Sequence, residues 1–271
     1  MPSPNQITAA QLNRKIGTPN CPILIDVSID QDFDADPYLI PTAMRRDFKT
    51  IDHWAHEFHD AKVVLICQKG LKLSSGACAI LRSKGIDAEF LEGGNQGWRK
   101  TGLMRIPAAT VPIGPMGHSV WVTRDRPKID RIACPWLIRR FIDPNAQFLF
   151  VPATQVLDVA EKYSATPFDS ANTFWGHRGD HCSFDTFTTE FGLNSAPLMA
   201  LARIVRAADT GNLELAPEAA GLLAASLGLS RIHRDDNIQL EAGLPLYDAF
   251  YRWARDASNE THTHPTGASV S

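Results

Sequence analysis

The sequence predicts two domains: an α/β domain, in which a parallel sheet is flanked by helices, and a mostly α-helical second domain. Over the first hundred residues, short β-branched runs alternate with segments of helical spacing, a pattern that favours parallel pairing. A segment rich in proline and glycine follows, and beyond it the apolar spacing is mainly helical. At 271 residues the chain is long enough for two domains of ordinary size.

The first domain is expected to span residues 1–106. Its first helix begins with Thr8 as an N-cap residue and ends near Gly17. A second helix places Ile51, Trp54 and Phe58 on one face, and a third ends at Gly85. The expected helices are 8–17, 48–59 and 73–84, and the expected strands are 23–27, 62–66 and 88–91.

Residues 107–117 contain three prolines and two glycines, so we predict a linker there. The second domain is then expected over 118–258, and the polar, unpatterned residues 259–271 are expected to be a disordered tail. Apolar residues at helical spacing predict the helices of the second domain. These helices are 135–141, 156–163, 198–208, 218–227 and 246–254.

The composition is that of a globular protein, with 44% hydrophobic and 21% charged residues. No apolar stretch is long enough to span a bilayer, and the first residues do not resemble a signal peptide, so we expect no membrane association. The net charge of −3 argues against nucleic acid as a partner. Five scattered cysteines are typical of free thiols in a reducing compartment, which predicts a cytoplasmic protein.

Cys67 is the strongest candidate for a catalytic residue. It directly follows the predicted strand 62–66 and precedes the predicted helix 73–84. A tight loop in this place turns backbone N–H groups inward, and the helix adds a partial positive charge. We therefore expect Cys67 to lose its proton readily and to act as a thiolate nucleophile. The loop expected to bind the anionic substrate consists of Gln68, Lys69, Gly70, Leu71 and Lys72.

This loop resembles the active-site loop of the rhodanese family of sulfurtransferases, and the resemblance covers most of the first hundred residues. The strand 23–27 ending in aspartate, the Ile-Pro segment 39–43 and the glycine–tryptophan segment 91–103 follow in the family order. The resemblance implies a rhodanese-like fold and a persulfide carried on Cys67. The implied partners are a small sulfur donor such as thiosulfate and a thiol or sulfite-type acceptor, with no certain cofactor.

Two alternatives for Cys67 remain. A phosphatase of the type that places Arg after Cys and five further residues needs a guanidinium to bind phosphate, but Leu73 occupies that position. A buried, inert cysteine is the other alternative, because free Cys is among the most buried residue types. The rhodanese family often has Arg where Lys72 stands and a small hydroxyl residue where Leu73 stands, which affects the expected donor binding.

A densely charged stretch opens the second domain. Its guanidinium groups are candidates for holding a small oxyanion, and Cys134, just before Pro135, is expected at a helix amino terminus. A solvated loop whose arginines lie on an outer helix face is the alternative. The candidate residues in this stretch are Asp130, Arg131, Cys134, Arg139 and Arg140.

Residues 130–143 resemble the most recognisable run of the chromate-resistance protein B family, within its carboxy-terminal domain. Further pieces in the family order extend the likeness over roughly residues 118–256. The resemblance implies a role linked to chromate or a related oxyanion, so chromate is an expected partner. Because a rhodanese-like domain stands where better-known members have another segment, we do not expect DNA binding.

A loop rich in His, Cys and Asp is a candidate transition-metal site. Imidazole, thiolate and carboxylate are suitable ligands for zinc or a similar ion. The expected ligands are His177, His181, Cys182 and Asp185, with His177 also a candidate general base and Asp130 and Asp209 as residues that converge on it. A polar loop with hydrogen-bonded histidines, or ordinary salt bridges between the arginines and aspartates, is the alternative.

Two functional hypotheses follow. In the first, the chain is an enzyme that moves sulfane sulfur through Cys67, while the second domain handles an oxyanion or a redox step. In the second, a non-catalytic rhodanese fold senses an oxyanion or the thiol state and regulates the response to that stress.

Overall fold

The structure is a computed structural model that describes residues 5–114 and 117–260. The first domain is built on a five-stranded sheet with the strand order β1-β6-β5-β2-β4, and every pairing in it is parallel. Asp26 pairs with both Ile66 and Arg45, so the carboxyl ends of these strands lie at one edge of the sheet. The strands are β1 (Gln6–Ile7), β2 (Ile23–Asp26), β4 (Met44–Arg45), β5 (Val63–Ile66) and β6 (Ala88–Leu91).

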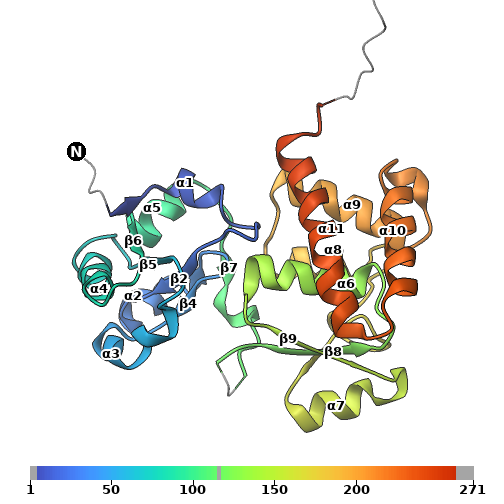
Figure 1. Ribbon diagram of the computed structural model, residues 1–271, viewed down its shortest axis with the longest axis horizontal. Helices are drawn as coiled ribbons and strands as arrows, with labels where there is room; N and C mark the ends of the chain where they lie inside the picture. Colours follow the sequence, from blue (N-terminus) through green and yellow to red (C-terminus); the bar gives the residue numbers. More distant parts are fainter. Residues whose placement is uncertain (1–4, 115–116, 261–271) are drawn as a thin grey trace, which may run out of the picture.

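Both faces of this sheet are covered, because alternate strand residues enter different hydrophobic clusters. Val64 packs with Leu12 and Trp98 on the face covered by α1 and α5, whereas Leu65 packs with Leu81 on the face covered by α3 and α4. The prediction of a parallel sheet flanked by helices is confirmed (Figure 1). The helices are α1 (Ala9–Asn13), α2 (Asp30–Asp34), α3 (Ile51–Trp54), α4 (Lys72–Ser83) and α5 (Gly94–Lys100).

Local signals explain most of these boundaries. Thr8 caps α1 through a capping box with Gln11.

The structure differs from the prediction in two places of the first domain. The helix expected over 48–59 is divided into the 3-10 segment η1 (Phe48–Thr50), α3 and the 3-10 segment η2 (Ala55–Phe58). A short antiparallel pair, β3 (Tyr38–Leu39) with β7 (Ile106–Pro107), was not predicted, and it ties the start of the expected linker to the first domain. A further 3-10 turn, η3 (Ala108–Thr110), follows it.

The second domain is rich in helices, as predicted, but it also contains a parallel sheet that the prediction omitted. The central strand β8 (Val120–Arg124) lies between β9 (Gln147–Val151) and β10 (Thr166–Pro167). One face of this sheet packs on α7. The other face, which carries Trp121 and Phe148, packs on the remaining helices of the domain (Figure 1). The helices are α6 (Asp130–Leu137), α7 (Val156–Tyr163), α8 (Ser183–Glu190), α9 (Ala196–Asp209), α10 (Ala219–Ile232) and α11 (Asp236–Asp256), with 3-10 turns η5 (Ala153–Gln155) and η6 (Leu213–Leu215).

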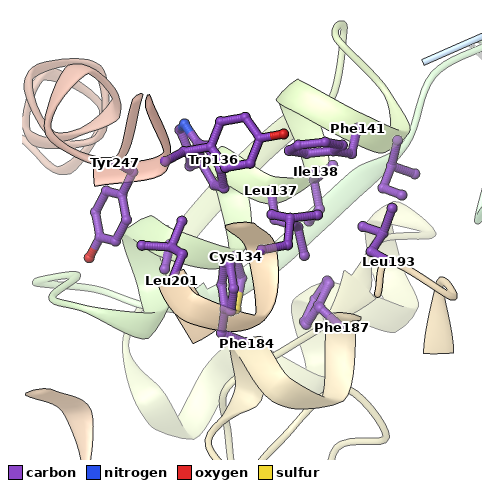
Figure 2. Packing of buried hydrophobic residues seen from close by; sticks show 14 of the residues in the cluster. Cys134, Trp136, Leu137, Ile138, Phe141, Phe184, Phe187, Leu193, Leu201 and Tyr247 are labelled. Atoms are coloured by element: carbon purple, nitrogen blue, oxygen red, sulfur yellow. The ribbon is translucent and has the colours of Figure 1, made fainter. Parts of the chain in front are cut away.

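The helix expected to begin at Pro135 begins five residues earlier. Asp130 is the first residue of α6, Pro135 lies inside the helix, and the π-helical segment η4 (Ile138–Ile142) continues it. Ile129, directly before the helix, has φ +42°, a strained conformation for a β-branched residue. Cys134 is consequently in the middle of α6 and fully buried in the hydrophobic cluster (Figure 2). The prediction that Cys134 lies at a helix amino terminus is therefore wrong.

The two domains pack against each other through one continuous hydrophobic cluster. Leu12 and Trp98 of the first domain belong to the same cluster as Trp136 and Phe141 of the second. Gly17 lies at this junction, where a Cβ atom would stand 2.4 Å from Phe141 Cζ and 2.8 Å from Tyr251 Cε1. The close approach of the two domains therefore requires a residue without a side chain here.

Residues 115–116 of the expected linker and residues 261–271 of the expected disordered tail lie outside the described residues. Within the described ranges, no helix combines the length and apolar character needed to cross a membrane.

Candidate functional site

Cys67 lies where the sequence predicts it, between the carboxyl end of β5 and the start of α4. Its side chain is buried, with 4% of its surface exposed, and Sγ is 3.1 Å from Ser74 Oγ. Ser74 lies on α4 and is fully buried, so its hydroxyl group is a buried hydrogen-bonding partner of the thiol. The thiol and its hydroxyl partner come from one continuous strand–loop–helix segment.

The loop that follows Cys67 is held by the first turn of α5. Asn95 N donates to Cys67 O at 3.0 Å, and Gln96 N donates to Gln68 O at 3.0 Å. Asn95 also donates through Nδ2 to Asp26 Oδ2 at 2.8 Å, which connects the start of α5 to the end of β2. Gly70 has φ +64°, and a Cβ on it would lie 2.5 Å from Leu91 O, so glycine is required at this close approach.

The N–H groups of residues 68–74 are available to an external acceptor. Within the described residues, none of them donates a hydrogen bond to a protein acceptor. Lys69 and Lys72 are exposed beside them, and Leu71 has 62% of its surface exposed. A loop of free amides with two lysines at a helix start favours an anion next to Cys67.

The other four cysteines lie in surroundings that suppress ionisation. Burial raises the pKa of the Cys21, Cys78, Cys134 and Cys182 thiols. Each of the five cysteines is a free thiol. These four are therefore poor candidates for a thiolate nucleophile.

In the second domain, three carboxylates surround one imidazole nitrogen. His177 Nε2 is 3.5 Å from Asp130 Oδ2, 3.4 Å from Asp169 Oδ1 and 3.2 Å from Asp209 Oδ2. Asp130 begins α6, Asp209 ends α9, and Asp169 and His177 lie in the segment between β10 and α8. We call these four residues the His177 cluster. Its members come from distant parts of the second domain.

Hydrogen bonds fix the carboxylates of the His177 cluster. Asp130 is fully buried and accepts hydrogen bonds from Ser183 N and Phe184 N at the start of α8. Asp169 Oδ1 accepts from Ser183 Oγ at 2.8 Å, and its Oδ2 lies 3.2 Å from Arg131 Nε. The amino terminus of α8 thus orients two of the three carboxylates.

The protonation of the cluster follows from these contacts. Hydrogen bonding to Asp130 and Asp169 raises the pKa of His177 to about 10, while burial raises the pKa of Asp209 to about 7. Burial also raises the pKa of Asp130. Burial acts to raise the pKa of Asp169, but hydrogen bonds from His177 and Ser183 hold this pKa below its usual value. The imidazole is therefore positively charged at neutral pH.

A cavity of about 480 Å³ opens beside the His177 cluster. His177, Asp169 and Arg124 lie on its wall, together with residues of the 170–176 loop. Side-chain exposure of 45% at His177 agrees with this open side. A small molecule can therefore reach the imidazole from the cavity.

The structure separates the arginines that were expected to gather around an oxyanion. Arg140 forms a forked pair with Asp248, with both N–O distances at 2.8 Å, and Arg139 pairs with Glu241. Both acceptors lie on α11, whereas Arg131 pairs with Asp169 in the His177 cluster. Carboxylates of α11 therefore neutralise Arg139 and Arg140. For these two residues the structure agrees with the alternative of ordinary salt bridges.

The expected metal ligands do not form one group either. Among the described residues, the group of potential ligands that includes His177 contains Asp130 and Asp209, whose ligand atoms lie within 4.8 Å of one another. Asp185 caps α8 by accepting from Cys182 N and lies 3.6 Å from Arg206 Nε, and His181 is exposed. The predicted set of His177, His181, Cys182 and Asp185 is therefore replaced by one centred on His177, Asp130 and Asp209.

Two residues of this region were missed as candidates. Asp169 has φ +43° and contacts His177, while Arg124 at the end of β8 lies 3.4 Å from the carboxylate of Asp169. Arg124 opens the charged stretch that contains Asp130 and Arg131, and Asp169 precedes His177 by eight residues, but the sequence does not show that their side chains meet. A prediction of β8 and β10 would have placed both at the carboxyl edge of the sheet, where ligands commonly bind.

The raised pKa of His177 predicts a pH-dependent contribution to stability. Because the folded-state pKa of about 10 exceeds the ordinary value of 6.5, the contribution is complete below 6.5 and is lost as the pH rises toward 10. Urea unfolding with a chelator present should therefore show a larger stability difference between the wild type and His177→Gln at about pH 6 than at about pH 10. Equal differences at the two pH values would contradict the proposed charge state.

Comparison with known proteins identifies both domains. Residues 8–101 match the model of the rhodanese-like domain family, and residues 121–254 match the model described as ChrB, C-terminal domain. The chain therefore joins a rhodanese-like domain to a ChrB-type carboxy-terminal domain, as the sequence predicts.

Similar individual proteins cover parts of the chain. Over 134 residues the chain is 37% identical to Protein ChrB of Cupriavidus metallidurans, a match that covers 48% of this chain and 39% of that protein. Solved structures of a Staphylococcus saprophyticus protein and of a Staphylococcus aureus rhodanese-like domain protein are each 26% identical, with TM-scores of 0.32. Each match covers 35% of this chain. It covers 92% of the Staphylococcus saprophyticus chain and 90% of the Staphylococcus aureus chain.

Proposed function

We propose that this protein is a sulfurtransferase that carries sulfane sulfur on Cys67. The observation that carries the proposal is the free amide groups of residues 68–74, which follow the thiol at the start of α4. A persulfide anion placed there accepts hydrogen bonds from this loop and is further stabilised by the start of the helix.

The proposed reaction has two steps. The Cys67 thiolate attacks the outer sulfur of thiosulfate, a new S–S bond forms, and the S–S bond of the donor breaks as sulfite leaves with the electron pair. A thiol or sulfite acceptor, in its anionic form, then attacks the outer sulfur of the persulfide and restores the Cys67 thiolate. Lys69 and Lys72 are placed to attract the anionic donor.

We place this chemistry in resistance to chromate or a related oxyanion. Support comes from the ChrB-type domain over residues 121–254 and from the 37% identity to Protein ChrB. In this proposal the rhodanese-like domain supplies reduced sulfur, and the second domain links that supply to the oxyanion.

Intact-mass measurement after incubation with thiosulfate tests the proposal. Wild-type protein is expected to gain the mass of one sulfur atom, and Cys67→Ser is expected to gain none. Cys78→Ser is the matched control, because Cys78 is a buried thiol on α4 that should be dispensable. A mass gain in Cys67→Ser would place the sulfur on another residue and overturn the proposal, whereas no gain in the wild type with any sulfane donor would favour a non-catalytic sensor.

A further inference from the structure

We infer that the His177 cluster binds a divalent cation, with His177 Nε2 and the carboxylates of Asp130 and Asp209 as ligands. This site lies in the second domain and does not depend on sulfur transfer at Cys67. The ligand atoms of these three residues already lie within 4.8 Å of one another. Ligand atoms about 2.1 Å from a common ion lie at most about 4.2 Å apart, so these atoms need to move only slightly inward to share one ion.

The contacts of His177 Nε2 fit an ion that replaces the proton on this nitrogen. A ring nitrogen has a single N–H group, yet Nε2 has three carboxylate oxygens at 3.2 to 3.5 Å. These distances exceed the 2.7 to 2.9 Å of well-formed charge-assisted hydrogen bonds. One proton therefore cannot satisfy all three acceptors, whereas an ion held by Nε2 can be coordinated by Asp130 and Asp209 at the same time.

The charges of the cluster point to the same conclusion. Among the described residues, neither Asp130 nor Asp209 has a Lys or Arg nitrogen within 4.0 Å, so their ionic partner is His177 alone. Asp130 is fully buried, and the Asp209 side chain has only 19% of its surface exposed. Because buried carboxylates need a compensating charge, one half-exposed imidazole is a poor match for Asp130 and Asp209 together, whereas Asp169 also pairs with Arg124 and Arg131.

The surroundings provide the second sphere of hydrogen bonds that metal sites require. Ser183 N and Phe184 N orient Asp130, while Ser183 Oγ and Arg131 hold Asp169. Because Arg131 occupies the second oxygen of Asp169, we assign Asp169 to positioning and not to direct coordination. The side chain of His177, which is 45% exposed, is free to move outward and make room for the ion.

The donor set selects the kind of ion. One imidazole and two carboxylates, with no thiolate in the group, suit a hard or borderline ion such as Mn²⁺ better than a soft one. The cavity of about 480 Å³ leaves the outer side of the ion accessible to water or to a small anion. Arg124 on the same wall gives such an anion a cationic partner.

Mn²⁺ binding to chelator-treated full-length protein without a histidine tag tests the inference. Calorimetry together with electron paramagnetic resonance should show one bound Mn²⁺ per chain. Asp209→Asn and His177→Gln should each weaken binding by at least ~10-fold, since even residues behind the ligands typically contribute 10- to 100-fold. Cys67→Ser should bind Mn²⁺ like the wild type, which separates this test from that of the proposed sulfur transfer.

Asp185→Asn is the matched control, because Asp185 is a neighbouring carboxylate that pairs with Arg206 and lies outside the ligand group. It should retain wild-type affinity for Mn²⁺. The inference is overturned if the wild type binds none of Mn²⁺, Zn²⁺ and Mg²⁺. Equal affinity in the wild type, Asp209→Asn and His177→Gln would overturn it as well, because the ion would then be held elsewhere.

Discussion

Gly94→Ala should slow the loading of sulfur onto Cys67 by about 100-fold, the typical effect of moving a reacting group by about 1 Å. Gly94 has φ +56°, and an added Cβ would lie 1.9 Å from Cys67 O and 2.4 Å from Gly70 N. Both neighbours are backbone atoms of the Cys67 loop, so the loop itself must move. The rate of mass gain with thiosulfate measures the effect.

Gly102→Ala is the control for Gly94→Ala. Gly102 also has a positive φ, +71°, but a Cβ on it would meet no atom within 4 Å. The substitution therefore brings a similar backbone strain of about 1 kcal/mol without displacing the Cys67 loop. If both variants load sulfur at the same rate, the position of the loop does not limit the reaction and the proposed role of its amides fails.

Asp130→Ala should lower the free energy of unfolding by about 2 to 3 kcal/mol. Asp130 is fully buried, and its carboxylate accepts from Ser183 N and Phe184 N at the start of α8. Alanine leaves both amides without this acceptor inside the protein, which is the costly form of losing a hydrogen bond. Urea unfolding followed by circular dichroism, with a chelator present, measures the change.

Asp130→Asn separates the capping role from the charge. The amide oxygen of asparagine still accepts from a backbone N–H, so this variant should lose less stability than Asp130→Ala. Asparagine is nevertheless a weaker cation ligand, and we expect reduced Mn²⁺ binding in a protein that remains folded. Wild-type stability in Asp130→Ala would contradict the capping role.

The Cys67 region could be predicted because its parts are contiguous. The β-branched run, the thiol and the amphipathic helix follow one another within residues 62–84, and the structure forms them as β5, the loop and α4. Periodicity reports such local structure well. The contact of Asn95 with Cys67 O was not predictable, because the pairing of β5 with β6 is what brings the start of α5 to the Cys67 loop.

Charged side chains of the second domain were predicted less well. Arg131, Arg139 and Arg140 stand close in the sequence, yet Arg131 contacts Asp169 while the other two contact carboxylates of α11. Long cationic side chains pair with whichever carboxylate packing brings near them. Their sequence spacing therefore says little about whether they form one anion site.

Local sequence patterns were enough to predict the two domains, the parallel sheet of the first, the helical character of the second and the place of Cys67. These features depend on apolar periodicity and turn residues, which act over a few positions of the chain. Asp130 and Asp209 were expected to converge on His177, but sequence spacing could not establish the contacts of the His177 cluster or include Asp169 in it. Asp130, Asp169 and Asp209 reach His177 from separate segments, because the packing of α6, α8 and α9 brings those segments together.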